Sequence, residues 1–142
     1  MKKSGLIVLL ALLLAGCQND IRRVEGTYSY KTSGKAVITI GDSTATVVLD
    51  NEIGAMEIIG QKDDNVLLTF NQLGGSAFVT TGVLRDSVIS LAPFDRGVDY
   101  LVGYDVVVSG CGHVYGSTIV FDLQYEGEHL NADEITMIAK RN

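Results

Sequence analysis

The stretch Ile119-Val120-Phe121-Asp122-Leu123-Gln124-Tyr125 carries the pattern that decides the fold of this chain. The large apolar side chains at 119, 121, 123 and 125 alternate with Asp122 and Gln124. A period of two is typical of a β-strand that buries one face and exposes the other. The stretch from Thr44 to Asp50 alternates in the same way. The alternation therefore predicts strands that enclose a core on one side.

Short apolar runs of this kind, separated by Gly, Asn, Asp and Ser, follow one another from Val24 almost to the C-terminus. Turn residues such as Ser33-Gly34 and Gly41-Asp42 lie between them. No window after residue 17 keeps a helical period over three turns. We expect strands near 24–31, 35–40, 44–50, 55–61, 65–71, 77–85, 87–92, 100–109, 116–125 and 134–140.

This spacing predicts an all-β fold, a single antiparallel meander of about eight to ten strands. We expect a closed or nearly closed barrel, because closure removes exposed strand edges. A β-sandwich is the alternative. The longest connector is expected around Pro93, over residues 92–100, and a second, polar connector over residues 126–133.

The N-terminus has the composition of a secretion signal. Lys2 and Lys3 precede nine apolar residues, 6–14, a run too short to span a membrane. The box Leu14-Ala15-Gly16-Cys17 that follows resembles the lipobox of bacterial lipoproteins. The resemblance implies a signal peptide over residues 1–16 and lipid attachment, including palmitate, at Cys17. Residues 17–23 are then a lipidated tether, and residues 24–142 form one β domain.

The lipoprotein resemblance also predicts where the protein is located. Gln18 stands where the inner-membrane retention signal of many such lipoproteins has Asp, so we expect the outer membrane of a Gram-negative-type envelope. The sequence leaves open whether the protein faces the periplasm or the cell surface. Removal of Lys2 and Lys3 changes the net charge from −6 to −8, which argues against nucleic-acid binding.

The opening of the first strand carries a second resemblance. Val24-Glu25-Gly26-Thr27-Tyr28 is similar to the Gly-x-aromatic start of lipocalin and calycin barrels, including calycin-like small lipoproteins of Bacteroidota. The usual aromatic residue is Trp, whereas this chain has Tyr28 and no Trp. The resemblance implies a barrel in which this aromatic side chain packs across the floor.

Residues suited to catalysis or metal binding are sparse. Cys111-Gly112-His113 is the one place where two soft ligand types stand close, and zinc would require further ligands. We expect these residues to form a Gly-rich bend between two strands. If Cys17 carries lipid, Cys111 is a lone thiol; otherwise the two cysteines could pair. The acidic residues are dispersed, and we predict neither a metal site nor a cofactor.

The connectors supply the candidate surface for a ligand or partner. Aromatic and charged residues stand together in the long connector around Pro93, and long loops on rigid scaffolds often carry function. His113 and Tyr115 stand in or beside the expected bend. The candidate residues are Phe94, Arg96, Tyr100, His113 and Tyr115.

These observations favour a lipid-anchored envelope module without catalytic activity that binds a small apolar ligand or another envelope component. One alternative is an envelope enzyme or enzyme inhibitor with a cleft near Cys111 and His113. Another is a structural subunit of an outer-membrane complex.

Overall fold

The structure is a computed structural model that describes residues 21–49, 52–73, 76–97 and 105–142. One helical turn, over residues 21–24, precedes ten strands. The strands are β1 (Gly26–Ile40), β2 (Ser43–Val48), β3 (Glu52–Gly60), β4 (Asn65–Gln72), β5 (Ala77–Arg85), β6 (Val88–Leu91), β7 (Phe94–Gly97), β8 (Asp105–Tyr115), β9 (Thr118–Glu126) and β10 (Leu130–Arg141).

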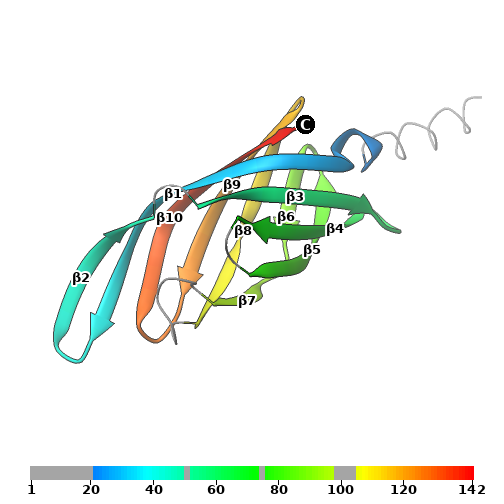
Figure 1. Cartoon of the computed structure of the whole chain (residues 1–142). Helices are drawn as coiled ribbons and strands as arrows, with labels where there is room; N and C mark the ends of the chain where they lie inside the picture. Colours follow the sequence, from blue (N-terminus) through cyan, green and yellow to red (C-terminus); the bar gives the residue numbers. More distant parts are fainter. Residues whose placement is uncertain (1–20, 50–51, 74–75, 98–104) are drawn as a thin grey trace, which may run out of the picture.

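Eight of these strands form a closed antiparallel barrel. They follow the order β10-β9-β8-β6-β5-β4-β3-β1, and the pairing of β10 with β1 closes the ring (Figure 1). Two strands lie outside the ring: β2 pairs with the second half of β1, and β7 pairs with the first half of β8. The predicted meander barrel is therefore confirmed, and the chain does not form a sandwich.

The prediction of a turn at Ser33-Gly34 is wrong, because both residues lie inside strand β1. Residues 26–40 form one continuous strand, which pairs first with β3 and then with β2 while β10 follows its other edge. A Cβ atom at Gly34 would lie 2.5 Å from Ile135 Cδ1 and 2.8 Å from the Glu134 carbonyl oxygen. The glycine thus permits a close approach of two strands, beside a register shift, and does not form a turn.

The prediction of a bend at Cys111-Gly112-His113 is also wrong. These residues lie inside strand β8, paired with β6 on one side and β9 on the other. A Cβ atom at Gly112 would lie 2.6 Å from the Phe121 ring. Gly112 is therefore a small residue that leaves room for a core aromatic side chain, which local sequence could not distinguish from a turn glycine.

The two expected connectors both contain strand residues. Residues 94–97, in the connector around Pro93, form β7. The segment from 126 to 133 contains the end of β9 and the start of β10, because Leu130 and Ala132 are buried and extend the strand. The expected strand 100–109 is described only from Asp105 onward, and residues 98–104 lie outside the described residues.

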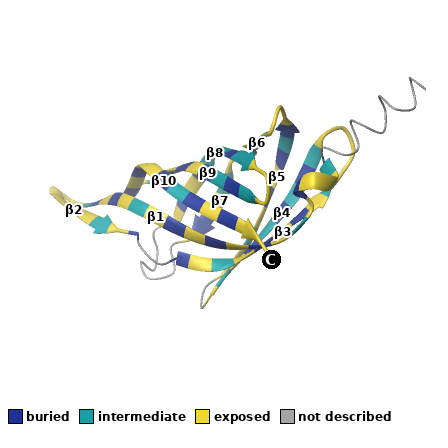
Figure 2. Ribbon diagram, turned by 90° about the horizontal axis from the view of Figure 1, so that it is seen from above, coloured by how far each residue is buried: buried dark blue, intermediate teal, exposed yellow. Residues whose placement is uncertain are grey.

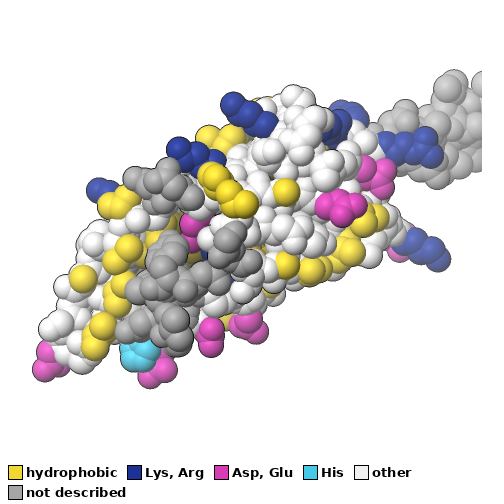
Figure 3. Space-filling model, viewed as in Figure 1, with side chains coloured by type: hydrophobic (Ala, Val, Ile, Leu, Met, Phe, Trp, Pro, Cys, Tyr) yellow, Lys and Arg dark blue, Asp and Glu magenta, His cyan; other side chains and the backbone are white. Residues whose placement is uncertain are grey.

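The alternation read from the sequence is present in the barrel wall. Ile119, Phe121, Leu123 and Tyr125 all point inward and are buried, and similar alternation follows β1 and β10 (Figure 2). Aromatic side chains fill part of the interior, where the Phe70 ring lies 5.0 Å from Phe78 and 6.3 Å from Phe121. On the face seen in Figure 3, apolar side chains form several small groups among polar and charged ones.

The helical turn at residues 21–24 and the end of β10 lie at one end of the barrel. Tyr28 is fully buried there, and its hydroxyl donates to the Val24 carbonyl oxygen at 2.7 Å. The Arg141 guanidinium, near the end of β10, lies 5.4 Å from the centre of the Tyr28 ring and donates to the Tyr28 hydroxyl at 2.9 Å. The position of Tyr28 agrees with an aromatic residue packed at the floor. Figure 1 shows the β1–β2 hairpin at the opposite end.

Candidate functional site

The fold places the charged side chain of Arg96 inside the barrel. In β7 the side chains of Phe94 and Arg96 point inward, whereas Asp95 and Gly97 are exposed. Only 6% of Arg96 is accessible to solvent. The sequence placed Arg96 on an exposed loop. That expectation is wrong, because pairing of β7 with β8 turns alternate residues toward the core.

Three strands provide polar partners for the Arg96 guanidinium. Its Nη2 donates to Glu52 Oε2 at 3.1 Å and to Gln72 Oε1 at 2.7 Å, and its Nη1 donates to the Tyr125 hydroxyl at 2.8 Å. The Arg96 and Glu52 side chains are each only 4% exposed, so their ion pair is buried. Glu52 begins β3, Gln72 ends β4 and Tyr125 is near the end of β9. Antiparallel connections bring these strand ends to the same end of the barrel.

Aromatic rings line the inward side of this polar cluster. The Arg96 guanidinium lies 4.8 Å from the centre of the Phe78 ring and 5.7 Å from that of Tyr125. Phe78 and Phe94 are stacked at 5.5 Å, which joins the inner faces of β5 and β7. A desolvated cation–π contact can contribute about 2 kcal/mol. The aromatic surface therefore helps to hold the guanidinium in place.

Thr32 adds a buried hydroxyl next to the cluster. It lies on β1 directly opposite Glu52 in the strand register, with its side chain inside the barrel. The residue is fully buried, and its Oγ1 has no hydrogen-bond partner within the described part of the chain. A buried hydroxyl without a partner costs about 1–3 kcal/mol. The position is therefore energetically unfavourable unless something else bonds to it.

Burial and neighbouring charge shift the pKa values of two members in the same direction. Burial alone lowers the pKa of Arg96, but the neighbouring Tyr125 and Glu52 outweigh burial and raise it above its ordinary value. Burial raises the pKa of Tyr125 to about 12, although the Arg96 charge opposes the shift. At neutral pH, Arg96 is thus a cation and the Tyr125 hydroxyl keeps its proton.

A small hollow gives access to Arg96 from outside the barrel wall. It has a volume of about 80 Å³ and lies between the start of β5 and β7, where β7 forms its ladder with β8. The residues around it are Ser76, Ala77, Phe78, Asp95, Arg96 and Gly97. A water molecule occupies about 30 Å³ of liquid, so the hollow has room for a terminal chemical group.

Cys111, His113 and Asp122 lie together on the outer face of the barrel. His113 Nε2 is 3.6 Å from Asp122 Oδ2 and 3.7 Å from Cys111 Sγ. In a nucleophile–base–acid relay the base uses one ring nitrogen for each partner, whereas here both contacts involve Nε2. Among the residues that the structure describes, no group of three or more His, Cys, Asp or Glu side chains could hold a metal ion.

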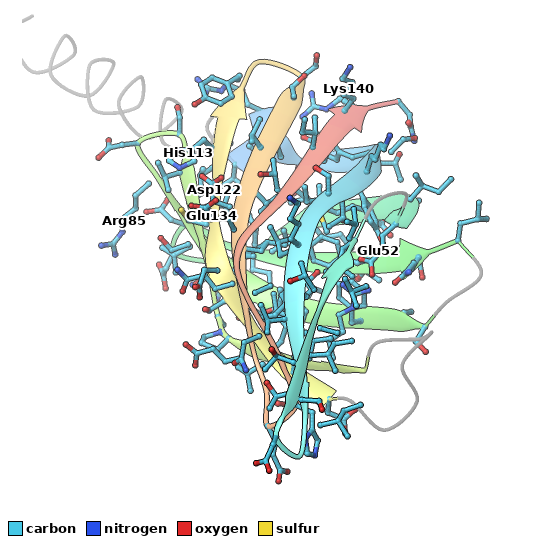
Figure 4. The ribbon with its side chains drawn as sticks, turned by 90° about the vertical axis from the view of Figure 1, so that its left-hand side faces the viewer. Glu52, Arg85, His113, Asp122, Glu134 and Lys140 are labelled. Atoms are coloured by element: carbon cyan, nitrogen blue, oxygen red, sulfur yellow. The ribbon has the colours of Figure 1, made fainter. Side chains whose placement is uncertain are left out.

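The predicted surface does not form one site. Phe94 and Arg96 come together inside the barrel. His113 pairs with β6 and β9 farther along β8, about 23 Å of strand away from the register partner of Arg96 at about 3.3 Å per residue. Tyr115 is 66% exposed beyond it, and Tyr100 lies outside the described residues. Figure 4 shows His113 and Asp122 on one side of the barrel and Glu52 on the other.

Sequence analysis missed Thr32, Glu52, Gln72, Phe78 and Tyr125 as members of a site. One signal was present: Glu52 is in phase with Met56 and Ile58, two inward positions of the same strand. A carboxylate in phase with core residues indicates a buried polar partner elsewhere. The pattern could not show that this partner is Arg96, which is 44 residues away.

A scan against protein-family models finds no match, and a search of curated proteins finds none either. Among the residues that the structure describes, no helix combines the length and the apolar character that crossing a membrane requires. Two features therefore characterise the protein: a closed antiparallel barrel, and a buried Arg96–Glu52 ion pair in its interior.

Proposed function

We propose that this protein is a lipid-anchored, non-catalytic binding module of the bacterial envelope that receives a small apolar ligand inside its barrel. The leader and the lipobox at Cys17 support the anchor. Closed barrels of about eight strands are suited to holding one small ligand at an open end. The cluster around Arg96 then binds the polar part of the ligand.

The buried ion pair is the observation that carries this proposal. Replacing a buried ion pair with apolar residues of similar size is often neutral or stabilises a protein by about 1–4 kcal/mol. Apolar side chains at positions 52 and 96 would therefore stabilise the protein about as well as the Arg96–Glu52 pair does. Arg96 is also presented by β7, a strand outside the closed ring. A recognition role explains why charge is retained there.

Ligand binding is tested on protein purified from membranes. Native mass spectrometry in mild conditions is expected to detect a bound small molecule, which solvent extraction then releases for identification. The double variant Glu52→Leu with Arg96→Leu removes the pair as a unit and is expected to lose the bound molecule. Cys111→Ser, on the outer face, is the matched control and keeps it. Identical bound material in both variants would exclude this site.

The lipid anchor is tested separately. Cells grown with an alkyne-labelled palmitate analogue are expected to incorporate label into the wild-type protein and not into Cys17→Ser. Density-gradient separation of the membranes is expected to place the labelled protein in the outer-membrane fraction. Equal labelling of Cys17→Ser would refute attachment at this cysteine, and recovery of the protein with inner membranes would refute the expected location.

A further inference from the structure

We propose that the outer face of β3, β4 and β5 lies against the surface of the membrane that holds the lipid anchor. We call this surface the β3–β5 face. It consists of the outward side chains at alternate positions from 53 to 59, from 65 to 73 and from 77 to 85. The proposal rests on the proposed anchor at Cys17 and goes beyond it, because it specifies which side of the barrel contacts the bilayer.

The β3–β5 face exposes a group of large apolar side chains. Ile53, Ile59, Leu73 and Val79 are 43%, 46%, 75% and 54% exposed. Ile53 and Leu73 are cross-strand neighbours, because the Leu73 N–H donates to the Ile53 carbonyl oxygen at 2.8 Å. Ile59 stands opposite Leu67 in the register. An exposed apolar surface that extends over neighbouring strands indicates a contact with a membrane or a protein.

Charge distinguishes this face from the other side of the barrel. The β3–β5 face has one charge of each sign, Glu57 and Arg85. The outer face of β8, β9 and β10 has five carboxylates and one lysine, namely Asp105, Asp122, Glu126, Asp133, Glu134 and Lys140. Contact with a bilayer would take these carboxylates out of water, and anionic head groups would repel them. The β8–β10 side is therefore unsuited to membrane contact, whereas the β3–β5 face is suited to it.

The chain that leads to the anchor starts beside this face. A Cβ atom at Gly60, the last residue of β3, would overlap Ile21 Cγ2 in the helical turn. The Gly60 N–H also donates to Glu25 Oε1 at 2.8 Å. Ile21 is four residues after Cys17, and four residues span at most about 14 Å. An acylated Cys17 therefore holds this end of β3 within about 14 Å of the bilayer.

Contact through the side of the barrel is more favourable than contact through its anchored end. The β3–β4 and β5–β6 turns are at that end, and they expose Asp63, Asp64 and Asp86 together with Lys62 and Arg85. A barrel that stood on these turns would press three carboxylates against the head groups. A barrel that lies on the β3–β5 face keeps these groups at the edge of the contact, in water, and buries apolar side chains along the strands.

A hollow on the same face favours lipid as the occupant. It has a volume of about 610 Å³, and its walls include Ile53, Ala55, Asn71 and Leu73. Pockets of this size hold small, mostly apolar ligands. An acyl chain is apolar and flexible, so it can fill the hollow while the surrounding side chains remain in the interface between head groups and acyl chains. Lipid therefore covers both the hollow and the exposed side chains around it.

The test measures lipid contact at single labelled cysteines. The full acylated chain, purified from membranes in the Cys111→Ser background, is reconstituted into vesicles of phosphatidylethanolamine and phosphatidylglycerol. A nitrobenzoxadiazole label is placed on Val79→Cys in β5 or, as the matched control, on Gln124→Cys in β9, which is also exposed and outward. Spin-labelled lipid is expected to quench the label at position 79 at least about twofold more than at position 124.

A substitution on the face tests the same contact without moving the label. Leu73→Asp is expected to reduce the quenching at position 79 to the level of the control. Val107→Asp, an exposed apolar position on β8, is expected to leave the quenching unchanged. Both sites are exposed, so melting temperatures near that of the wild type would show that the variants are folded.

The outcomes separate this inference from the proposed anchor. If the acylated chain floats with the vesicles but positions 79 and 124 are quenched equally, the inference is wrong and the anchor stands. If position 79 is protected from a water-soluble quencher but is not reached by spin-labelled lipid, a protein covers the face, and the inference is again wrong. If the purified chain has no acyl group and does not float, the anchor fails and the inference fails with it.

Discussion

Removing one charge of the buried Arg96–Glu52 ion pair is the most informative perturbation of this protein. Glu52→Leu leaves the Arg96 guanidinium buried with neutral partners, Gln72 and Tyr125, among the described residues. Surface pairs are worth at most about 1 kcal/mol, but these side chains are each only 4% exposed, so solvent screening does not apply. We therefore expect Glu52→Leu to lower the free energy of unfolding by about 3–5 kcal/mol.

The double variant shows whether the stability lost in Glu52→Leu comes from an unpaired buried charge or from lost packing. Glu52→Leu combined with Arg96→Leu removes both charges, and we expect it to be within about 1 kcal/mol of the wild type or more stable. Urea denaturation of the full chain in detergent micelles, followed by circular dichroism, measures both variants. A double variant that loses the sum of the two single effects would falsify the coupling, because the residues would then act independently.

Three further predictions concern the same fold. Because the pKa of Tyr125 is raised from 10.0 to about 12, the unfolded chain binds fewer protons than the folded one between these pH values. The free energy of unfolding is expected to fall by about 1.4 kcal/mol per pH unit there, and Tyr125→Phe to show a shallower fall in urea titrations at pH 9–12. Gly112→Ala is expected to cost about 1–3 kcal/mol, because its Cβ would meet the Phe121 ring at 2.6 Å. Gly97→Ala, whose Cβ would meet no atom of the described residues closer than 3.5 Å, is expected to change the midpoint little. Arg141→Met is expected to cost about 1–2 kcal/mol through its lost contacts with Tyr28, and the exposed neighbour Lys140→Met almost nothing, in the same denaturation assay.

Local patterns predicted the fold well because a barrel strand must alternate. The run from Ile119 to Tyr125 has one apolar face, and the structure buries that face in full. Turn positions were harder to recognise. A glycine is used both in turns and where two elements approach closely, so Gly34 and Gly112 were interpreted as breaks although they lie inside strands.

The candidate site was only partly visible in the sequence. Phe94 and Arg96 were selected because they stand in the segment around Pro93, and both belong to the interior cluster. The exposure expected of Arg96 was wrong, since β7 was not recognised as a strand. His113 and Tyr115 were selected because they stand in or beside the expected bend, and they lie on other parts of the surface of β8.

The sequence by itself determined the all-β class, the inward face of most strands and the prediction of a lipid anchor at Cys17. These follow from short-range periodicity and from a contiguous motif, which do not depend on distant residues. Only the tertiary structure decided that Arg96 meets Glu52, Gln72 and Tyr125. Periodicity shows which residues share a face of a strand. Strand order and register decide which inward side chains meet across the barrel, and both are fixed only when the barrel closes.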